Sequence, residues 1–380
     1  MTNRLATPEE RLEKLRATLS GARAETRSGR RICLNRPANL LYGVALHAAA
    51  RLDKGLPLTD LEERMIGLVS ELVPEKDEIA ALGRVYREAT ARGAIDVLPE
   101  QITSRPLEVG YSFADLKADM PAIVEALRAQ PNVNIVDLSK RDPAQPIDSD
   151  EFIAALAEYG GGVTVLTSSG GNDTQAGPLG PQPGQGGTVN VKMLLNKFQC
   201  NRESGESGRD EIYWGLSAGA DTTGKRSSTT REYGSISTGS WATFDNATQL
   251  FNGNVRKHLT IEIECWEADA SPGSWYTGLR SGLADIAEYA IDKAVAMTEA
   301  GDNETAKGAA VVALFAIGLG ILNWLLGFFT NDDDLVCRRT LGYDLAALRS
   351  FSAKPGGIDW WDFDGGGGGR HRLYIQTTVG

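Results

Sequence analysis

The segment from Gly308 to Phe329 constrains this chain more than any other, because its 22 residues carry no charge and only one amide, that of Asn323. At about 1.5 Å per residue, a helix of this length would span roughly 33 Å, which is enough for the hydrocarbon core of a bilayer. A buried helix in a globular domain is usually shorter and has a polar stripe. The segment therefore predicts either a membrane-spanning helix or a helix enclosed by the rest of the fold.

Small and aromatic residues in this segment favour the membrane alternative. Small side chains four residues apart allow a second helix to approach closely, and aromatic side chains near one end are typical of a membrane interface. The residues expected to insert are Ala313, Ala316, Ile317, Gly320, Trp324, Phe328 and Phe329. An amphipathic pattern over 274–300 precedes the segment, and the two together predict a helical hairpin over about 274–331.

Composition and charge limit the classes of protein that this chain can belong to. Its 380 residues are 42% hydrophobic, which is typical of a globular protein with more than one core. The net charge of -11 predicts that nucleic acid is not a partner, because binding phosphates requires a basic surface. The first residues, MTNRLATPEERLEK, lack the apolar run of a secretory signal, so we expect synthesis in the cytoplasm without a signal peptide.

The chain is predicted to begin with a mainly helical domain over 1–168. A helix cap at Thr7 is followed by proline and acidic residues, and apolar residues recur at helical spacing as far as about residue 93. Two apolar runs, 132–139 and 162–168, predict a small αβ part at the end of this domain. Residues 169–188 are rich in glycine and proline and are expected to be a flexible linker.

From residue 189 onward the apolar residues alternate with polar ones, which is the pattern of half-buried strands. In HLTIEIECWEAD (258–269), for example, apolar and polar side chains take opposite faces. Strands of this kind predict an antiparallel β-sandwich over 189–380, with the helical hairpin inserted. The expected fold class is therefore α+β, with a helical N-terminal domain followed by the sandwich.

The C-terminal half resembles C2-type β-sandwich modules. The resemblance rests on GRDEIYW (208–214), HLTIEIECWEAD (258–269), NDDDLV (331–336) and a closing glycine-rich strand pair. It covers about 190 residues and is interrupted by the helical hairpin, which C2 modules lack. The resemblance implies a sandwich fold and acidic loops that could bind calcium.

Acidic residues at the ends of predicted strands and of the hairpin are the candidate metal ligands. Calcium binds carboxylate oxygens gathered from loops, and aspartates after a helix C-terminus are unfavourable without a compensating cation. The candidate calcium ligands are Asp210, Glu267, Asp269, Asp332, Asp333 and Asp334. The alternative is that these carboxylates are simply solvated.

The remaining motifs do not indicate an enzyme. The sequence GADTTGK (219–225) has the spacing of a phosphate-binding loop, but Arg226 stands where magnesium binding needs serine or threonine, which favours a β-turn. The three histidines are far apart in the sequence, and the four cysteines are too scattered for a disulfide framework, so reduced thiols are expected. Trp360 and Trp361, before a glycine run, predict a loop with aromatic anchors.

Two functions are compatible with these patterns. The first is a bacterial membrane-associating protein that anchors in or perforates a bilayer through the hairpin, as an effector or docking factor of a phage-tail-like contractile injection system. In that function the lipid bilayer is one partner, the helical domain binds a protein partner, and a pore would require a homo-oligomer on the membrane. The second is a soluble C2-like binding module for calcium, a lipid headgroup or a protein, with the hairpin packed as core. No cofactor is expected apart from calcium.

Overall fold

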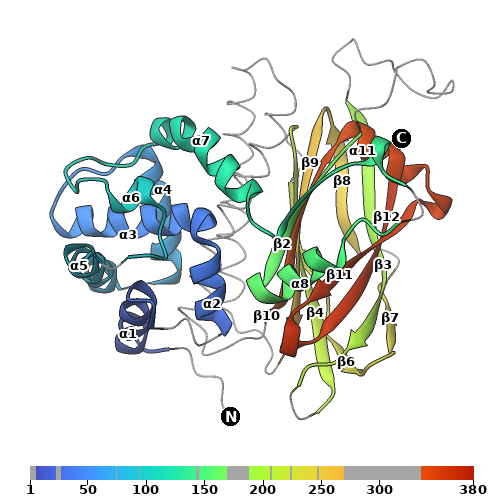
Figure 1. Ribbon diagram of the computed structural model, residues 1–380, viewed down its shortest axis with the longest axis horizontal. Helices are drawn as coiled ribbons and strands as arrows, with labels where there is room; N and C mark the ends of the chain where they lie inside the picture. Colours follow the sequence, from blue (N-terminus) through green and yellow to red (C-terminus); the bar gives the residue numbers. More distant parts are fainter. Residues whose placement is uncertain are drawn as a thin grey trace. The chain divides into compact units, whose positions relative to one another are not determined.

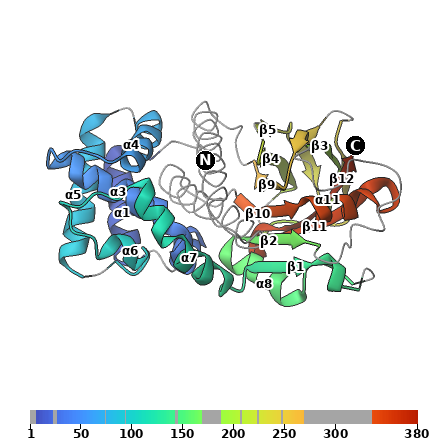
Figure 2. The same cartoon turned by 90° about the horizontal axis from the view of Figure 1, so that it is seen from above.

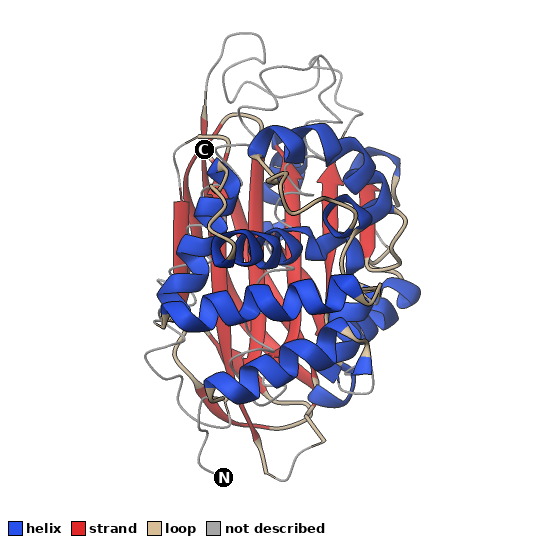
Figure 3. Ribbon diagram, turned by 90° about the vertical axis from the view of Figure 1, so that its left-hand side faces the viewer, coloured by secondary structure: helices blue, strands red, loops and turns tan. Residues whose placement is uncertain are grey.

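The computed structural model describes residues 6–22, 27–73, 75–93, 95–142, 145–168, 188–205, 208–222, 225–245, 248–268 and 335–380. They form two compact units, a helical one within 6–127 and a sheet-rich one made of 128–268 and 335–380. Figure 1 labels the elements of both units, and Figure 3 distinguishes helices from strands by colour.

The helical unit is built around a helix that is buried on nearly every side. Its helices are α1 (Pro8–Leu19), α2 (Arg27–Leu34), α3 (Leu40–Asp53), α4 (Asp60–Leu72), α5 (Lys76–Ala91), α6 (Glu100–Thr103) and α7 (Phe113–Arg128), with a short 3-10 turn at Arg36–Asn39 before α3. Every residue of α3 from Leu40 to Arg51 is buried, and α3 contacts α4, α5 and α6. The helices start where the sequence provides caps, because α1 and α4 each begin with a capping box, at Thr7 and Thr59.

A glycine sets the distance between the two helices that contact most closely in this unit. A Cβ atom at Gly83 of α5 would lie 2.4 Å from the carbonyl carbon of Ala49 in α3. The absence of a side chain therefore lets the two backbones approach.

The sheet-rich unit is a sandwich of two sheets. Sheet A has the order β1 (Val133–Asp137), β2 (Gly161–Thr167), β10 (Leu335–Asp344), β9 (His258–Glu267), β4 (Asp210–Ala220) and β5 (Lys225–Thr229), with β6 (Tyr233–Ile236) also paired to β4. Sheet B has the order β11 (Ile358–Asp364), β12 (Arg370–Val379), β3 (Val189–Arg202) and β7 (Trp241–Thr243), with β8 (Gln249–Val255) also paired to β3. Sheet B is antiparallel throughout, whereas β2 pairs in parallel with β1 and β10 in sheet A.

Two helices join the sheets and complete the core. The helix α8 (Asp150–Tyr159) packs against β2 of sheet A and β11 of sheet B, and α11 (Leu345–Ser352) contacts β10 and β12, which also belong to different sheets. Figure 2 shows α8 beside β1 and β2. Aromatic residues from both sheets, including Phe198, Trp214 and Phe363, are packed edge to face at the centre. Short 3-10 turns occur at Leu138–Lys140, Pro355–Gly357 and Gly366–Gly368.

The predicted α+β class, with helices first and a sandwich after them, is confirmed. Four features of the sandwich differ from the sequence analysis or go beyond it. The strands β1 and β2, expected at the end of the helical domain, belong to sheet A. The region of Trp360 and Trp361 is the strand β11 and not a loop. The GADTTGK segment connects the paired strands β4 and β5, with Gly219 opposite Lys225. The helix α11 was not predicted.

The prediction of a transmembrane helix, and with it of a pore-forming toxin or effector, is corrected. Within the described ranges no helix is long and apolar enough to cross a membrane. The longest of them, α5 and α7, have 16 residues each, whereas a bilayer requires about 20. The hairpin region 274–331, including 308–329 and all seven residues expected to insert, lies outside the described residues.

Candidate metal site

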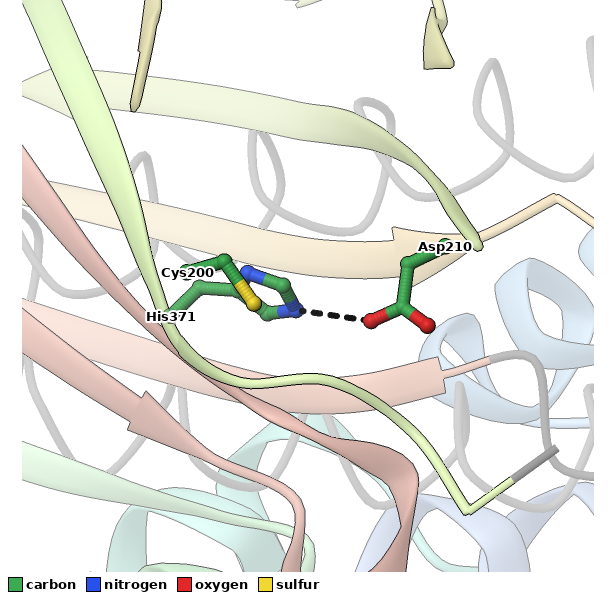
Figure 4. Close-up of side chains that lie close together, drawn as sticks. All are labelled: Cys200, Asp210 and His371. Carbon is green, nitrogen blue, oxygen red and sulfur yellow. Dashed lines mark ion pairs between the residues drawn. The ribbon is translucent and has the colours of Figure 1, made fainter. Parts of the chain in front are cut away.

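Three side chains that can bind a metal ion converge inside the sandwich. Cys200 of β3 and His371 of β12 are directly opposite each other in sheet B, and Asp210 begins β4 in sheet A. Both residues of sheet B point into the core because their strands alternate, with the neighbouring Phe198 and Leu373 also buried. Figure 4 shows the three side chains directed toward one another.

The distances within this cluster are somewhat longer than those between ligands around one ion. One ligand atom from each of Cys200, Asp210 and His371 lies within 4.8 Å of the other two. Nε2 of His371 is 3.8 Å from Oδ2 of Asp210, which is too long for a hydrogen bond. Bonds of about 2.0 Å to nitrogen and oxygen and about 2.3 Å to sulfur, at tetrahedral angles, separate ligand atoms by roughly 3.3–3.6 Å. Small side-chain movements would therefore be enough to enclose an ion.

The imidazole of His371 has an unusual environment. The residue has no exposed surface, and neither of its ring nitrogens has a hydrogen-bond partner among the described residues. The ring contacts Phe198 edge to face, with 6.2 Å between ring centroids. A buried polar group without a partner costs about 1–3 kcal/mol, so such a group in a folded protein calls for an explanation. A metal ion at this position would provide one.

Asp210 is held in place by Ser204, which follows β3 in the chain. The backbone N–H of Ser204 donates to the carboxylate of Asp210, at 3.1 and 3.0 Å from its two oxygens. The hydroxyl of Ser204 lies 2.8 Å from Oδ1 of Asp210 and 3.2 Å from Oε1 of Glu267. Because a hydroxyl has one proton, it can donate to only one of these carboxylates at a time. Ser204 therefore orients Asp210 and links it to Glu267.

Burial governs the protonation of the cluster. It lowers the pKa of His371 to about 4, against the opposing effect of Asp210, so the ring is neutral near pH 7. Burial, together with the charges of Asp210 and Glu203, raises the pKa of the Cys200 thiol to about 12. The neutral imidazole is ready to bind a metal ion, whereas the thiol would lose its proton on binding.

Two of the six predicted calcium ligands are brought together, and the others are not described. Asp210 and Glu267 lie on the adjacent strands β4 and β9 and share Ser204. The other four predicted ligands, Asp269, Asp332, Asp333 and Asp334, lie outside the described residues. The sequence analysis missed Cys200 and His371 as ligands. Their inward positions could be read from the alternation of β3 and β12, but their register could not.

The other histidines and cysteines do not belong to this ligand set, although the charges of Asp210 and Cys200 act on the nearby Cys265 and help to raise its pKa. His47 is buried in α3 of the helical unit, and His258 begins β9. Cys265 and Cys337 face each other across β9 and β10, and both are buried as free thiols. Burial raises the pKa of Cys265 well above its ordinary value, so it is not a thiolate near pH 7.

The sheet-rich unit is thus a β-sandwich with a buried cysteine, aspartate and histidine whose ligand atoms lie within 4.8 Å of one another. A stretch of 70 residues is 36% identical to an RNA-free ribonuclease P of Alkalilimnicola ehrlichii, and it covers 18% of this chain and 35% of that protein. The chain thus matches about a third of the length of that relative. No protein-family model and no solved structure matches the chain.

Proposed function

We propose that the sheet-rich unit is a binding module whose two sheets are joined by a buried divalent ion of the zinc type. The observation that carries the proposal is the convergence of Cys200, Asp210 and His371, with both nitrogens of the fully buried His371 unpaired among the described residues. Because Cys200 and His371 belong to sheet B and Asp210 to sheet A, the ion would connect the two layers.

The donor set favours zinc over calcium. Thiolate and imidazole ligands select zinc and related transition metals, whereas calcium binds oxygen ligands almost exclusively. Glu267 is the candidate fourth ligand, because its carboxylate shares the Ser204 hydroxyl with Asp210. Calcium binding by the wider acidic set and the resemblance to C2 modules both remain predictions.

The ion is proposed to be structural. Cys200 and His371 have no exposed surface and Asp210 is 2% exposed, so a substrate could not reach an open coordination position. A cysteine, histidine and aspartate can also form a nucleophilic site, but such a site needs an accessible thiol with a lowered pKa. The buried Cys200 has the opposite properties.

The likeness to an RNA-free ribonuclease P does not carry a proposal of the same activity. The matched stretch covers 35% of that protein, and the cluster described here is closed to a polymer.

The proposal is tested by metal content and thermal stability. The full chain, freed of metal with a chelator and then given Zn²⁺, should retain about one zinc per chain after desalting. It should also melt at a higher temperature, because an ion at 100 times its Kd stabilises the native state by about 2.7 kcal/mol. Ca²⁺ at the same concentration should produce a smaller rise.

Two variants and one control assign the ion to the site. Cys200→Ser and His371→Gln should each lose the bound zinc, whereas Cys33→Ser, which removes a half-buried thiol of the helical unit, should keep it. Full zinc content in both site variants would show that the ion binds elsewhere and would refute the proposal.

A further inference from the structure

The outer face of sheet B carries a stripe of aromatic and basic side chains. This aromatic–basic stripe consists of Trp241 of β7, Lys197 of β3, Tyr374 and Arg372 of β12, and Trp360 of β11. These residues alternate along their strands with core residues such as Phe198, Leu373 and Trp361. The stripe therefore lies on the side of the sheet that faces away from the metal site.

The strand register makes the stripe continuous. Tyr374 lies directly opposite Lys197 on one side and Trp360 on the other. The ammonium of Lys197 is 4.2 Å from the ring centroid of Trp241 and 5.1 Å from that of Tyr374. The guanidinium of Arg372 lies 3.8 Å from the ring centroid of Trp360. Cations at these distances are attracted to the ring faces, which holds the side chains of the stripe together above the sheet.

Half of the Trp241 side chain is open to solvent. It is 49% exposed, and the other large hydrophobic residues exposed in the described chain are aliphatic: Leu52, Val109, Ile135 and Ile358. Its ring lies 5.6 Å from that of Tyr374, with 36° between the planes. An exposed indole beside a second ring is a surface on which a planar group can stack.

The same face is basic although the chain is acidic. Five basic residues point outward from β3, β11 and β12, against two acidic ones, so the net charge of this face is +3 while that of the whole chain is -11. The basic residues are Lys192, Lys197, Arg202, Arg370 and Arg372, and the acidic ones are Asp362 and Asp364. Both acids are already paired. Arg372 donates to the two oxygens of Asp362 at 3.0 and 2.9 Å, and Arg202 donates to Asp364 at 2.6 Å. Lys197 remains directed at the rings, where it can meet an anion.

We propose that the aromatic–basic stripe binds single-stranded nucleic acid. Unpaired bases would stack on Trp241 and Tyr374, and a phosphate would lie beside Lys197, which is how sequence-tolerant single-strand binders work. A neutral glycan could stack on the rings but would not interact with the excess positive charge. Charge complementarity therefore favours a polyanion with planar groups over a glycan. The prediction that nucleic acid is not a partner rested on the net charge of the whole chain, which hides this local excess.

Nucleic acid bound at the stripe would be a ligand of the proposed binding module, and its binding does not require the ion. The stripe and the metal site lie on opposite sides of the same two strands, with Gln199 beside Cys200 and Arg372 beside His371. Binding is therefore measured with both the zinc-loaded and the chelator-treated full chain. Failure of zinc binding with intact oligonucleotide binding would refute only the proposed ion, and the reverse result would refute only the stripe.

The test uses fluorescence anisotropy with fluorescein-labelled oligouridylate and oligothymidylate of about 15 nucleotides. We expect binding at about 50 mM salt that weakens as salt is added. Trp241→Ala and Tyr374→Ala should each weaken binding about tenfold, because each removes a stacking surface. Lys197→Gln should reduce the slope of log K against log salt concentration by about 0.7, the value for one lost phosphate contact on a single strand.

Two variants in the helical unit are matched controls. Val109→Ala removes a side chain that is 50% exposed, and Arg92→Gln removes an exposed positive charge. Both should bind as the unsubstituted chain does. Tighter binding of oligouridylate than of oligothymidylate, or the reverse, would show which of the two nucleic acids is preferred. Binding of either oligonucleotide supports the proposal.

Three results would overturn the proposal. The first is no binding of either oligonucleotide at protein concentrations up to about 100 µM. The second is binding that Trp241→Ala and Tyr374→Ala leave unchanged while both variants remain folded by circular dichroism. The third is stripe-dependent binding to phosphatidylglycerol vesicles without oligonucleotide binding, which would assign the face to an anionic lipid surface.

Discussion

Nε2 of His371 lies 3.8 Å from Oδ2 of Asp210, and the two residues come from opposite sheets of the sandwich. The separation is too long for a hydrogen bond and close to that of two ligands of one ion. An ion between them would turn an unfavourable feature of the core, a buried and unpaired imidazole, into a link between the sheets.

Replacing His371 by leucine should therefore have opposite effects in the two metal states. In the metal-free chain His371→Leu removes a buried polar group without hydrogen-bond partners in the described chain, so stability should be unchanged or rise by about 1 kcal/mol. The rise in melting temperature on adding Zn²⁺ should disappear. Urea unfolding with and without zinc measures both effects. A loss of several kcal/mol in the metal-free variant would mean that the imidazole stabilises the core without an ion.

The buried ion pair of Arg339 and Asp148 in the sandwich should stabilise the fold only when both of its charges are present. Arg339 is fully buried, donates to both oxygens of Asp148 at 2.5 and 2.9 Å and lies over the ring of Trp361. Arg339→Met should cost about 3–5 kcal/mol, because it leaves the carboxylate of Asp148 buried and unpaired.

The double variant Arg339→Met with Asp148→Leu is the control, because it removes both charges. Most of the lost stability should return in denaturant unfolding. A single-variant cost below about 1 kcal/mol, or no recovery in the double variant, would contradict the importance of this pair.

The helical unit has a carboxylate whose stability contribution depends on pH. Glu62 has no exposed surface. Burial alone would raise its pKa. Hydrogen bonds from His47 and from the backbone N–H groups of Thr59 and Tyr111, together with the charge of Arg51, outweigh burial and lower the pKa below its ordinary value. The ionised form thus stabilises the native state.

Glu62→Gln should accordingly cost about 3 kcal/mol at pH 7, where Arg51 loses its charged partner. Because the pKa of Glu62 is lower in the folded chain than in the unfolded one, its contribution is present above about pH 4.5. It is lost as the pH falls through the folded value. The difference between Glu62→Gln and the unsubstituted chain should therefore shrink toward pH 3 in urea melts. The exposed neighbour variant Glu63→Gln should show neither effect, and a pH-independent difference would refute the assignment.

The segment between β9 and β10 should be removable. Trp266 and Leu335 are paired at the ends of these adjacent antiparallel strands, so Asn-Gly in place of residues 269–334, together with Glu267 and Ala268, gives a short hairpin connection of four residues. The shortened chain should show strand-rich circular dichroism and a cooperative melt. An aggregated product, or one without a cooperative transition, would mean that the segment supplies part of the core.

Local patterns predicted several of the elements but missed α11 and β11, and contacts between distant residues were not predictable. The cap at Thr7 and the alternation of β9 are signals within a few residues, and the structure has the expected helix and strand. The parallel pairing of β2 with β10 joins segments far apart in the chain, and no local pattern specifies it.

The candidate site was predictable only in part, for the same reason. Asp210 and Glu267 were identified as acids at strand ends, and they do meet at Ser204. Cys200 and His371 were visible as inward residues of their strands, but the register that places them opposite each other depends on pairing across the sheet. Trp241 lies on the three-residue strand β7, which is too short to show an alternating pattern.

The most direct test of the central claim is the absorption spectrum of the chain loaded with Co²⁺ in place of zinc. A cobalt ion bound to the thiolate of Cys200 should give a sulfur-to-metal charge-transfer band in the near ultraviolet and intense tetrahedral bands in the visible. Cys200→Ser should lose the charge-transfer band, and Cys33→Ser should keep it. A spectrum without a thiolate band, or one that Cys200→Ser leaves unchanged, would contradict a metal site at Cys200, Asp210 and His371.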